Sequence, residues 1–132
     1  MMDAANQTLL LVDDEENFRE IFSARLAAEG YRVETASDGE EAIEKARTIK
    51  PDLILMDVKM PKLNGIQATL KLRDDPATKD LKVVLLTNFG DPHPIDGEFQ
   101  SSLPKEVNAI GFVPKTEDLE AIVARVKSFL AQ

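Results

Sequence analysis

The sequence predicts an α/β fold in which a doubly wound, five-stranded parallel sheet carries helices on both faces. Five short apolar stretches alternate along the chain with segments whose apolar residues recur at helical spacing. The stretches at 8–12 and 53–57 have almost no polar interruption, which is typical of strands buried on both faces of a parallel sheet. The 132 residues include no cysteine, so a single core must hold the fold without disulfide bonds.

The first half of the chain is expected to form strand, helix, strand and helix in turn. The strand at 8–12 stops at an acidic turn, and Gly30 is predicted to end the helix that follows. Apolar and polar residues alternate at 31–35, as in a half-buried strand. Ser37 and Glu40 are predicted to form a capping box for the second helix. The inner faces of these helices are expected to carry Phe18, Ile21, Phe22 and Leu26, and then Ala42, Ile43 and Ala46.

The second half begins with a buried strand at 53–57 that ends in Asp57. A third helix is predicted after Gly65 and is expected to stop near Pro76, because proline cannot continue a helix. Further strands are predicted at 81–86 and 109–113. Thr116 is predicted to cap a last helix, whose apolar stripe consists of Leu119, Ile122, Val123, Val126 and Leu130.

The stretch 91–104 weakens the pattern, because three prolines and Gly97 interrupt it. A fourth helix expected here is therefore predicted to be short or irregular, at about 98–103. The whole chain, 1–132, is predicted to be one domain, with residues 1–7 as a flexible N-terminus.

Composition limits the classes of partner. The formal net charge of -8 disfavours direct contact with nucleic acid, because a surface of this sign repels phosphate backbones. The N-terminus has no cationic region ahead of an apolar run, and no apolar run approaches the roughly 20 residues that cross a bilayer. We therefore expect a cytoplasmic protein without membrane contact.

Polar residues follow four of the predicted strands, and they are the candidate functional residues. Asp13 and Asp14 follow the first strand, Asp57 ends the third, Thr87 follows the fourth and Lys115 follows the fifth. Ligands of such sheets bind beyond the carboxyl ends of the strands, so these side chains are expected to converge if the first and third strands are neighbours. Taken singly, the aspartates also fit helix caps and turns, Thr87 a turn, and Lys115 a solvated surface residue.

Three converging carboxylates repel one another unless a cation or a proton compensates their charge. Oxygen ligands without histidine or cysteine favour Mg²⁺ over zinc or copper, and Mg²⁺ readily accepts a phosphate oxygen. Asp57 is then the natural nucleophile for an aspartyl phosphate. Lys115 would contribute a point charge and Thr87 a hydroxyl donor to the phosphoryl oxygens.

With these residues the chain resembles the receiver domains of bacterial two-component response regulators. The resemblance runs from about Thr8 to the C-terminus. Its motif residues are Asp13-Asp14, Asp57 in the segment 56–61 with Gly65 beyond it, Thr87, and Phe112 with Lys115. It implies a flavodoxin-like fold with strand order 2-1-3-4-5.

The resemblance also implies functions for individual residues. Asp57 would accept phosphate from a sensor histidine kinase or a phosphotransfer protein, without the chain being an enzyme in the usual sense. Asp13, Asp14 and Asp57 would hold Mg²⁺ together with the backbone carbonyl of Lys59. Lys115 would bind the phosphoryl group. Thr87 and Phe112 would then switch a surface that binds a downstream protein; many members have a tyrosine where this chain has Phe112.

Two other functions remain open from the sequence, and a third fails on charge. A receiver-like module that binds partners without phosphorylation would keep the same residues. A magnesium-dependent aspartyl phosphatase would place its nucleophile after the first strand, with a second aspartate two residues on. A flavodoxin-like cofactor module would need a phosphate-binding loop where the acidic run 13–16 lies, and that run would repel a phosphate.

Overall fold

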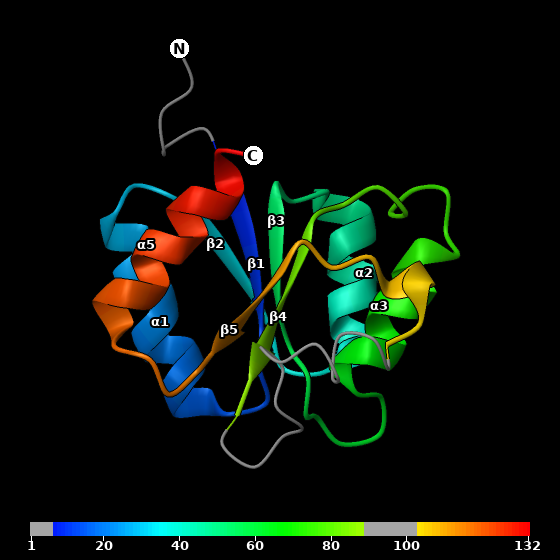
Figure 1. The fold of residues 1–132 in the computed structure, drawn as a ribbon, viewed down its shortest axis with the longest axis horizontal. Helices are drawn as coiled ribbons and strands as arrows, with labels where there is room; N and C mark the ends of the chain where they lie inside the picture. The colour runs from blue at the N-terminus through cyan, green and yellow to red at the C-terminus, as the bar shows by residue number, and fades with distance from the viewer. Residues whose placement is uncertain (1–6, 89–102) are drawn as a thin grey trace.

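The computed structural model describes residues 7–88 and 103–132 and contains one five-stranded parallel sheet (Figure 1). Its strands are β1 (Thr8–Val12), β2 (Arg32–Ala36), β3 (Leu53–Asp57), β4 (Val83–Thr87) and β5 (Gly111–Pro114). They lie in the order β2-β1-β3-β4-β5, and every neighbouring pair is parallel. The predicted fold class and strand order are therefore confirmed.

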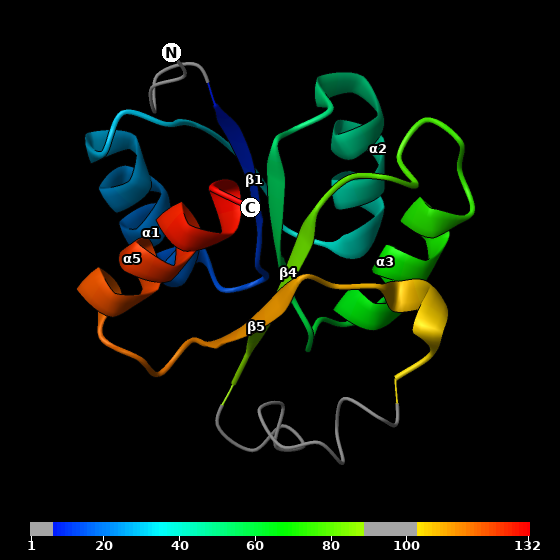
Figure 2. The same cartoon turned by 45° about the horizontal axis from the view of Figure 1, so that its top comes forward.

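Within residues 7–88 and 103–132, four α-helices cover the two faces of the sheet. They are α1 (Glu16–Ala28), α2 (Gly39–Ile49), α3 (Gly65–Arg73) and α5 (Leu119–Leu130). Figures 1 and 2 show α1 and α5 together on one face, and α2 and α3 together on the other. A 3₁₀ turn, η2 (Lys105–Val107), precedes β5. The short fourth helix predicted at about 98–103 lies outside the described residues, apart from its last position.

Alternate residues of the central strands serve two separate hydrophobic layers. On the α1 and α5 side, Leu9 and Leu11 of β1 pack with Phe22 of α1 and Ile122 of α5. On the other side the intervening residues of β1 pack with the small residues of α2 and α3; these are Leu10 and Val12 with Ala42, Ala46 and Ala68. Because both faces are covered, β1 and β3 need apolar residues at successive positions, which explains their uninterrupted sequence pattern.

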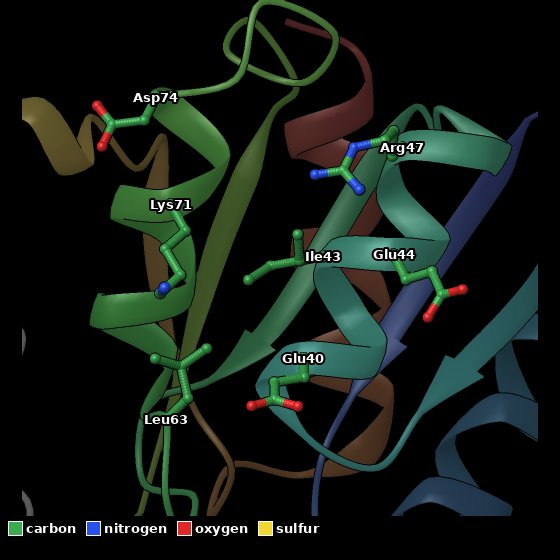
Figure 3. A pocket seen from close by; sticks show the side chains of 7 residues that line it. All are labelled: Glu40, Ile43, Glu44, Arg47, Leu63, Lys71 and Asp74. Atoms are coloured by element: carbon green, nitrogen blue, oxygen red, sulfur yellow. The ribbon is translucent and has the colours of Figure 1, made fainter.

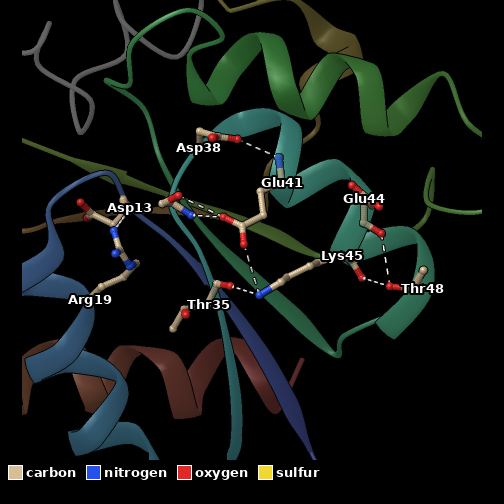
Figure 4. Close-up of polar contacts among 9 residues, drawn as sticks. Asp13, Arg19, Thr35, Asp38, Glu41, Glu44, Lys45 and Thr48 are labelled. Carbon is tan, nitrogen blue, oxygen red and sulfur yellow. Dashed lines mark hydrogen bonds and ion pairs between the residues drawn. The ribbon is translucent and has the colours of Figure 1, made fainter.

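The predicted capping box of α2 is wrong by one residue. Asp38, not Ser37, has the extended cap conformation, and its carboxylate accepts a hydrogen bond from the Glu41 backbone N–H at 2.8 Å. Ser37 instead donates through its backbone N–H and its hydroxyl to the Glu41 carboxylate. Lys45 of the same helix donates to the Thr35 carbonyl at 2.5 Å and so ties α2 to β2 (Figure 4).

The start of the last helix was also predicted too early. The Glu117 N–H donates to the Pro114 carbonyl in a turn, so α5 begins only after Asp118, and Thr116 does not cap it. Three strands are displaced from their predicted bounds as well, to 32–36, 83–87 and 111–114. Gly30 does follow α1 with a left-handed φ of 102°, as predicted for the residue after a helix end.

Arg73, the last residue of α3, joins three segments of the chain. Its guanidinium donates to the carbonyls of Lys79 and Leu81 ahead of β4, at 2.8 and 2.7 Å. It also donates to the carbonyls of Val107 and Asn108 ahead of β5, at 3.0 and 3.1 Å. The sequence pattern did not predict this polar function of Arg73.

A further negative finding concerns membranes. Among the described residues, no helix has both the length and the apolar character that crossing a bilayer requires.

Candidate functional site

The strand register brings the acidic residues together at the carboxyl edge of the sheet. Val12 pairs with Met56, so the next residues, Asp13 and Asp57, leave neighbouring strands side by side. Asp14 completes the group, and one carboxylate oxygen from each of the three lies within 4.8 Å of the others. The convergence predicted from the sequence is therefore present in the structure.

The three carboxylates differ in their surroundings. Asp13 and Asp57 are fully buried, whereas Asp14 is exposed. Burial, together with the adjacent Asp13 and Asp14, raises the pKa of Asp57 to about 8, although Lys115 opposes the shift. Burial also raises the pKa of Asp13, against the lowering effect of Lys115. In the protein alone, the site therefore holds less negative charge at neutral pH than its three acids suggest.

The buried Asp57 carboxylate lacks a hydrogen-bond donor among the described residues. Within the described residues, neither Asp57 oxygen accepts a hydrogen bond, although both are inaccessible to solvent. Buried carboxylate oxygens are normally paired, so this one has the properties of a ligand for a cation. Its neighbours supply only oxygen donors, which fits Mg²⁺ rather than a softer metal.

Lys115 is the cation of the site. Its Nζ lies 2.7 Å from Asp13 Oδ2 and 3.8 Å from Asp57 Oδ2, and it also pairs with the exposed Glu15 carboxylate. Burial lowers the pKa of Lys115, but the Asp13 and Glu15 carboxylates outweigh burial and leave the pKa above its ordinary value. Lys115 is therefore charged at neutral pH and already directed at the acidic group.

The main chain at Lys115 is fixed by β4. The Lys115 N–H donates to the Thr87 carbonyl at 2.7 Å, which continues the pairing of Thr87 with Pro114. All peptide bonds of the described residues are trans, including the bond between Lys115 and Thr116. The ends of β4 and β5 are thus joined directly behind the site.

The remaining predicted residues lie around this centre. Thr87 is buried at the end of β4. Lys59 lies with Asp14 along a hollow of about 480 Å³ that also reaches Asn88 and Thr116. Phe112 is partly buried against the α2 and α3 layer, where it borders a separate hollow of about 440 Å³ beside η2.

Two residues of α1, Phe18 and Arg19, contact the site although the sequence did not predict them there. The Arg19 guanidinium donates to the Asp13 backbone carbonyl at 2.8 Å, and both residues appear in Figure 4. Phe18 places its ring 4.5 Å from the Lys115 ammonium. The sequence showed Phe18 only as one of several apolar helix residues, because nothing in helical spacing identifies a ring that faces a cation.

A different hollow, of about 630 Å³, lies between α2 and α3 (Figure 3). Leu63 and Ile43 form its apolar part, with Glu40 and Arg47 of α2 facing Lys71 of α3 (Figure 3). None of the strand-end residues lines it, and its mixture of charges selects no single ligand class.

Comparison with known proteins agrees with this geometry. Residues 9–127 match the model of the response regulator receiver domain, so the chain belongs to that family. It is 40% identical over 125 residues to the alkaline phosphatase synthesis transcriptional regulatory protein PhoP of Bacillus subtilis, a match that covers 95% of this chain and 49% of that protein. It is 39% identical over 120 residues to the response regulator PleD of Caulobacter vibrioides, covering 91% of this chain and 25% of PleD.

Solved structures give the same result. The chemotaxis protein CheY4 of Vibrio cholerae matches with a TM-score of 0.79 and 29% identity over 92% of this chain and 97% of that one. The N-terminal domain of a response regulator receiver protein from Methanoculleus marisnigri matches with a TM-score of 0.74 and 28% identity, over 96% and 98% of the two chains. The present chain is thus a receiver domain of the two-component type, and it spans half or less of the length of PhoP and PleD.

Proposed function

We propose that this receiver domain is controlled by Mg²⁺-dependent phosphorylation of Asp57. The observation that carries the proposal is the buried Asp57 carboxylate, which lies between two further acids and a charged lysine and accepts no hydrogen bond from the described residues. Such a group is poised to bind a cation and to react, because no hydrogen bond satisfies its oxygens and the Lys115 ammonium lies 3.8 Å away.

The reaction follows from that arrangement. An Asp57 carboxylate oxygen attacks the phosphorus of a phosphohistidine on a sensor histidine kinase or a phosphotransfer protein. The new O–P bond forms as the P–N bond breaks, and the electron pair returns to the imidazole nitrogen, which takes up a proton from solvent. The product is an acyl phosphate on Asp57, so the chain is a regulatory acceptor rather than a conventional enzyme.

Asp13, Asp14 and Asp57 would hold Mg²⁺, together with the Lys59 backbone carbonyl. When bound, Mg²⁺ neutralises phosphoryl oxygens and lowers the repulsion between them and the acids. The orphaned oxygens of Asp57 and the all-oxygen donor set support this assignment.

Lys115 and Thr87 would bind the phosphoryl group, and Thr87 with Phe112 would transmit its presence. Thr87 is buried at the strand end next to Asp57, and its main chain is joined to Lys115, so a hydroxyl drawn toward the new phosphate would disturb β4 and β5 together. Phe112 lies on β5 against the opposite layer of the core, where a change of its ring position would alter the surface beside η2.

The expected output is a change in affinity for a downstream protein. PhoP and PleD are longer than this chain. Any further domains and partners of the whole protein are therefore part of this proposal and are not properties of the receiver domain. PhoP is named as a transcriptional regulatory protein, whereas the acidic receiver is expected to make no direct contact with nucleic acid. A cytoplasmic location fits a kinase partner of this class.

The function can be tested with acetyl phosphate as a small phosphodonor. Incubation with Mg²⁺ should add a single phosphoryl group to the protein, detectable by intact mass. Labelling should be absent in Asp57→Asn and in the presence of EDTA, because either change removes the acceptor or its metal. Labelling that persists in Asp57→Asn would contradict the assignment, and a wild-type protein that is never labelled would favour the phosphorylation-independent binding module.

Lys115 offers a second test of the site. Lys115→Ala should retain Mg²⁺ affinity within about threefold, because the ligands are carboxylates and a carbonyl. It should lose the chemical-shift changes of Thr87 and Phe112 that accompany phosphorylation in the wild type. Both properties can be followed in one NMR titration series, first with Mg²⁺ and then with acetyl phosphate. Unaltered phosphorylation-linked shifts in the variant would exclude Lys115 as the phosphoryl contact.

A further inference from the structure

The Lys115 ammonium is enclosed on the side away from Asp57. Only 4% of the Lys115 side chain is exposed, and besides Asp13 it contacts the Glu15 carboxylate and the face of the Phe18 ring. Asp57, at 3.8 Å, is the most distant of its three acidic partners. The lysine is therefore held mainly from the α1 side of the site.

Glu15 is placed for this contact by the start of α1. It occupies the N-cap position, but its side chain makes no capping hydrogen bond. Its backbone N–H donates to Asp13 Oδ1 at 2.8 Å, which fixes the Glu15 main chain against the acidic group. The Glu15 carboxylate is thus free of helix capping and pairs instead with a lysine 100 residues away.

Phe18 limits where the ammonium can move. It lies in the first turn of α1 and packs on Phe22 with their ring centroids 5.3 Å apart, so its ring is supported by the core. A cation over a supported aromatic face gains a further attraction, which adds to the pull of Glu15. Glu15 and Phe18 together form a holding site for the Lys115 ammonium.

We propose that Glu15 is a positioning residue that retains Lys115 on the α1 side until a phosphoryl group on Asp57 competes for it. The inference rests on the proposed phosphorylation of Asp57 and extends it to a residue that sets its rate and extent. A phosphoryl group carries nearly two negative charges, whereas the Glu15 carboxylate carries one and is 59% exposed. The Lys115 ammonium therefore moves from Glu15 to the phosphoryl group. Because Glu15 attracts the same ammonium, it lowers the fraction of molecules in which this movement is complete.

Kinetic measurements on two Glu15 variants and a matched control test the proposal. With Mg²⁺ and acetyl phosphate, Glu15→Gln should be labelled about two- to fivefold faster than the wild type, the range expected from loss of one partly exposed ion pair. Glu15→Asp keeps the charge but shortens the side chain, so it should behave like Glu15→Gln if contact with Lys115 is what matters. Glu16→Gln removes the same charge from an exposed neighbour with no such contact, and it should leave the rate unchanged.

Two outcomes of that experiment would overturn the proposal. An unchanged rate in Glu15→Gln would show that the pair does not restrain Lys115. An equal acceleration in Glu16→Gln, with no effect of Glu15→Asp, would show only that negative charge near the site repels the anionic donor.

A metal-free measurement separates this inference from phosphorylation itself. Urea unfolding in EDTA would give the free energies of unfolding of Glu15→Gln, Lys115→Met and the double variant. The effect of Glu15→Gln on this free energy should largely disappear once Lys115 is replaced. This coupling is expected even if Asp57 is never phosphorylated, so failure of the proposed function would leave it in place. Strictly additive effects of the two substitutions on the free energy of unfolding would show that Glu15 does not hold Lys115. Such a result would not bear on the phosphorylation test.

Discussion

Gly65→Ala should destabilise the protein by about 3 kcal/mol or more, although alanine is the better helix former. A Cβ at this position would lie 2.1 Å from the backbone oxygen of Asp57 and 2.9 Å from its carbonyl carbon. Backbone atoms cannot turn aside as a flexible side chain can, so β3 and the start of α3 must separate. Urea unfolding with a far-UV circular dichroism signal would measure the loss.

Gly39→Ala is a matched control, because Gly39 is also the first residue of a helix. Its added Cβ would meet Leu63 atoms no closer than 3.0 Å, so the cost should be clearly smaller than at Gly65. The Gly65 N–H also donates to the Val58 carbonyl at 2.8 Å, which closes the turn after Asp57. Gly65→Ala should therefore slow labelling by acetyl phosphate as well, and a variant as stable as the wild type would disprove the close approach.

The metal-free protein should become less stable as the pH rises from about 4 to about 8. The pKa of Asp57 is about 8 in the folded state and near its ordinary 3.8 in the unfolded chain. The folded state thus holds a proton that the unfolded chain releases, so stability is greatest below pH 4 for this group and falls until the pH passes the folded pKa. We expect the fall by pH 7 to be on the order of 2–4 kcal/mol.

Asp57→Asn isolates that contribution, because the amide keeps the shape and cannot ionise. The variant should be more stable than the wild type at pH 7 in EDTA and should show a flatter pH profile. Mg²⁺ should stabilise the wild type at pH 7 and have little effect on the variant, since bound cation favours the ionised carboxylate. Chemical denaturation at a series of pH values gives all three results, and parallel profiles for the two proteins would refute the raised pKa.

Much of the fold was accessible from the sequence because burial dictates the pattern. Strands buried on both faces must be apolar throughout, and Asp57 was conspicuous as the charge that ends such a strand. The carboxyl-edge rule for parallel sheets then associated Asp57 with Asp13 and Lys115, which the structure places together.

Helix starts were less accessible because several neighbouring residues can supply the same hydrogen bond. Ser37 and Asp38 both accept readily from a helix N-terminus, and only the backbone conformation selects Asp38. Thr116 was displaced in the same way, because the chain makes a turn before α5 begins. Such choices depend on tertiary packing, which one sequence does not display.

Long-range polar contacts of residues outside the strand ends could not be predicted from the sequence. Glu15 looked like one more acid in an acidic turn, and its partner lies 100 residues further on. No local pattern distinguishes such a residue from a solvated neighbour such as Glu16, because both fit the first turn of a helix equally well.

The four hydrogen bonds of Arg73 have a consequence for how the molecule opens. One side chain at the end of α3 binds the segments that precede both β4 and β5, through carbonyls at 79, 81, 107 and 108. If either segment frays, part of the half-buried Arg73 guanidinium loses its hydrogen-bond acceptors. The loss costs free energy because the group is charged. The amino ends of these two strands and α3 should therefore open as one cooperative unit.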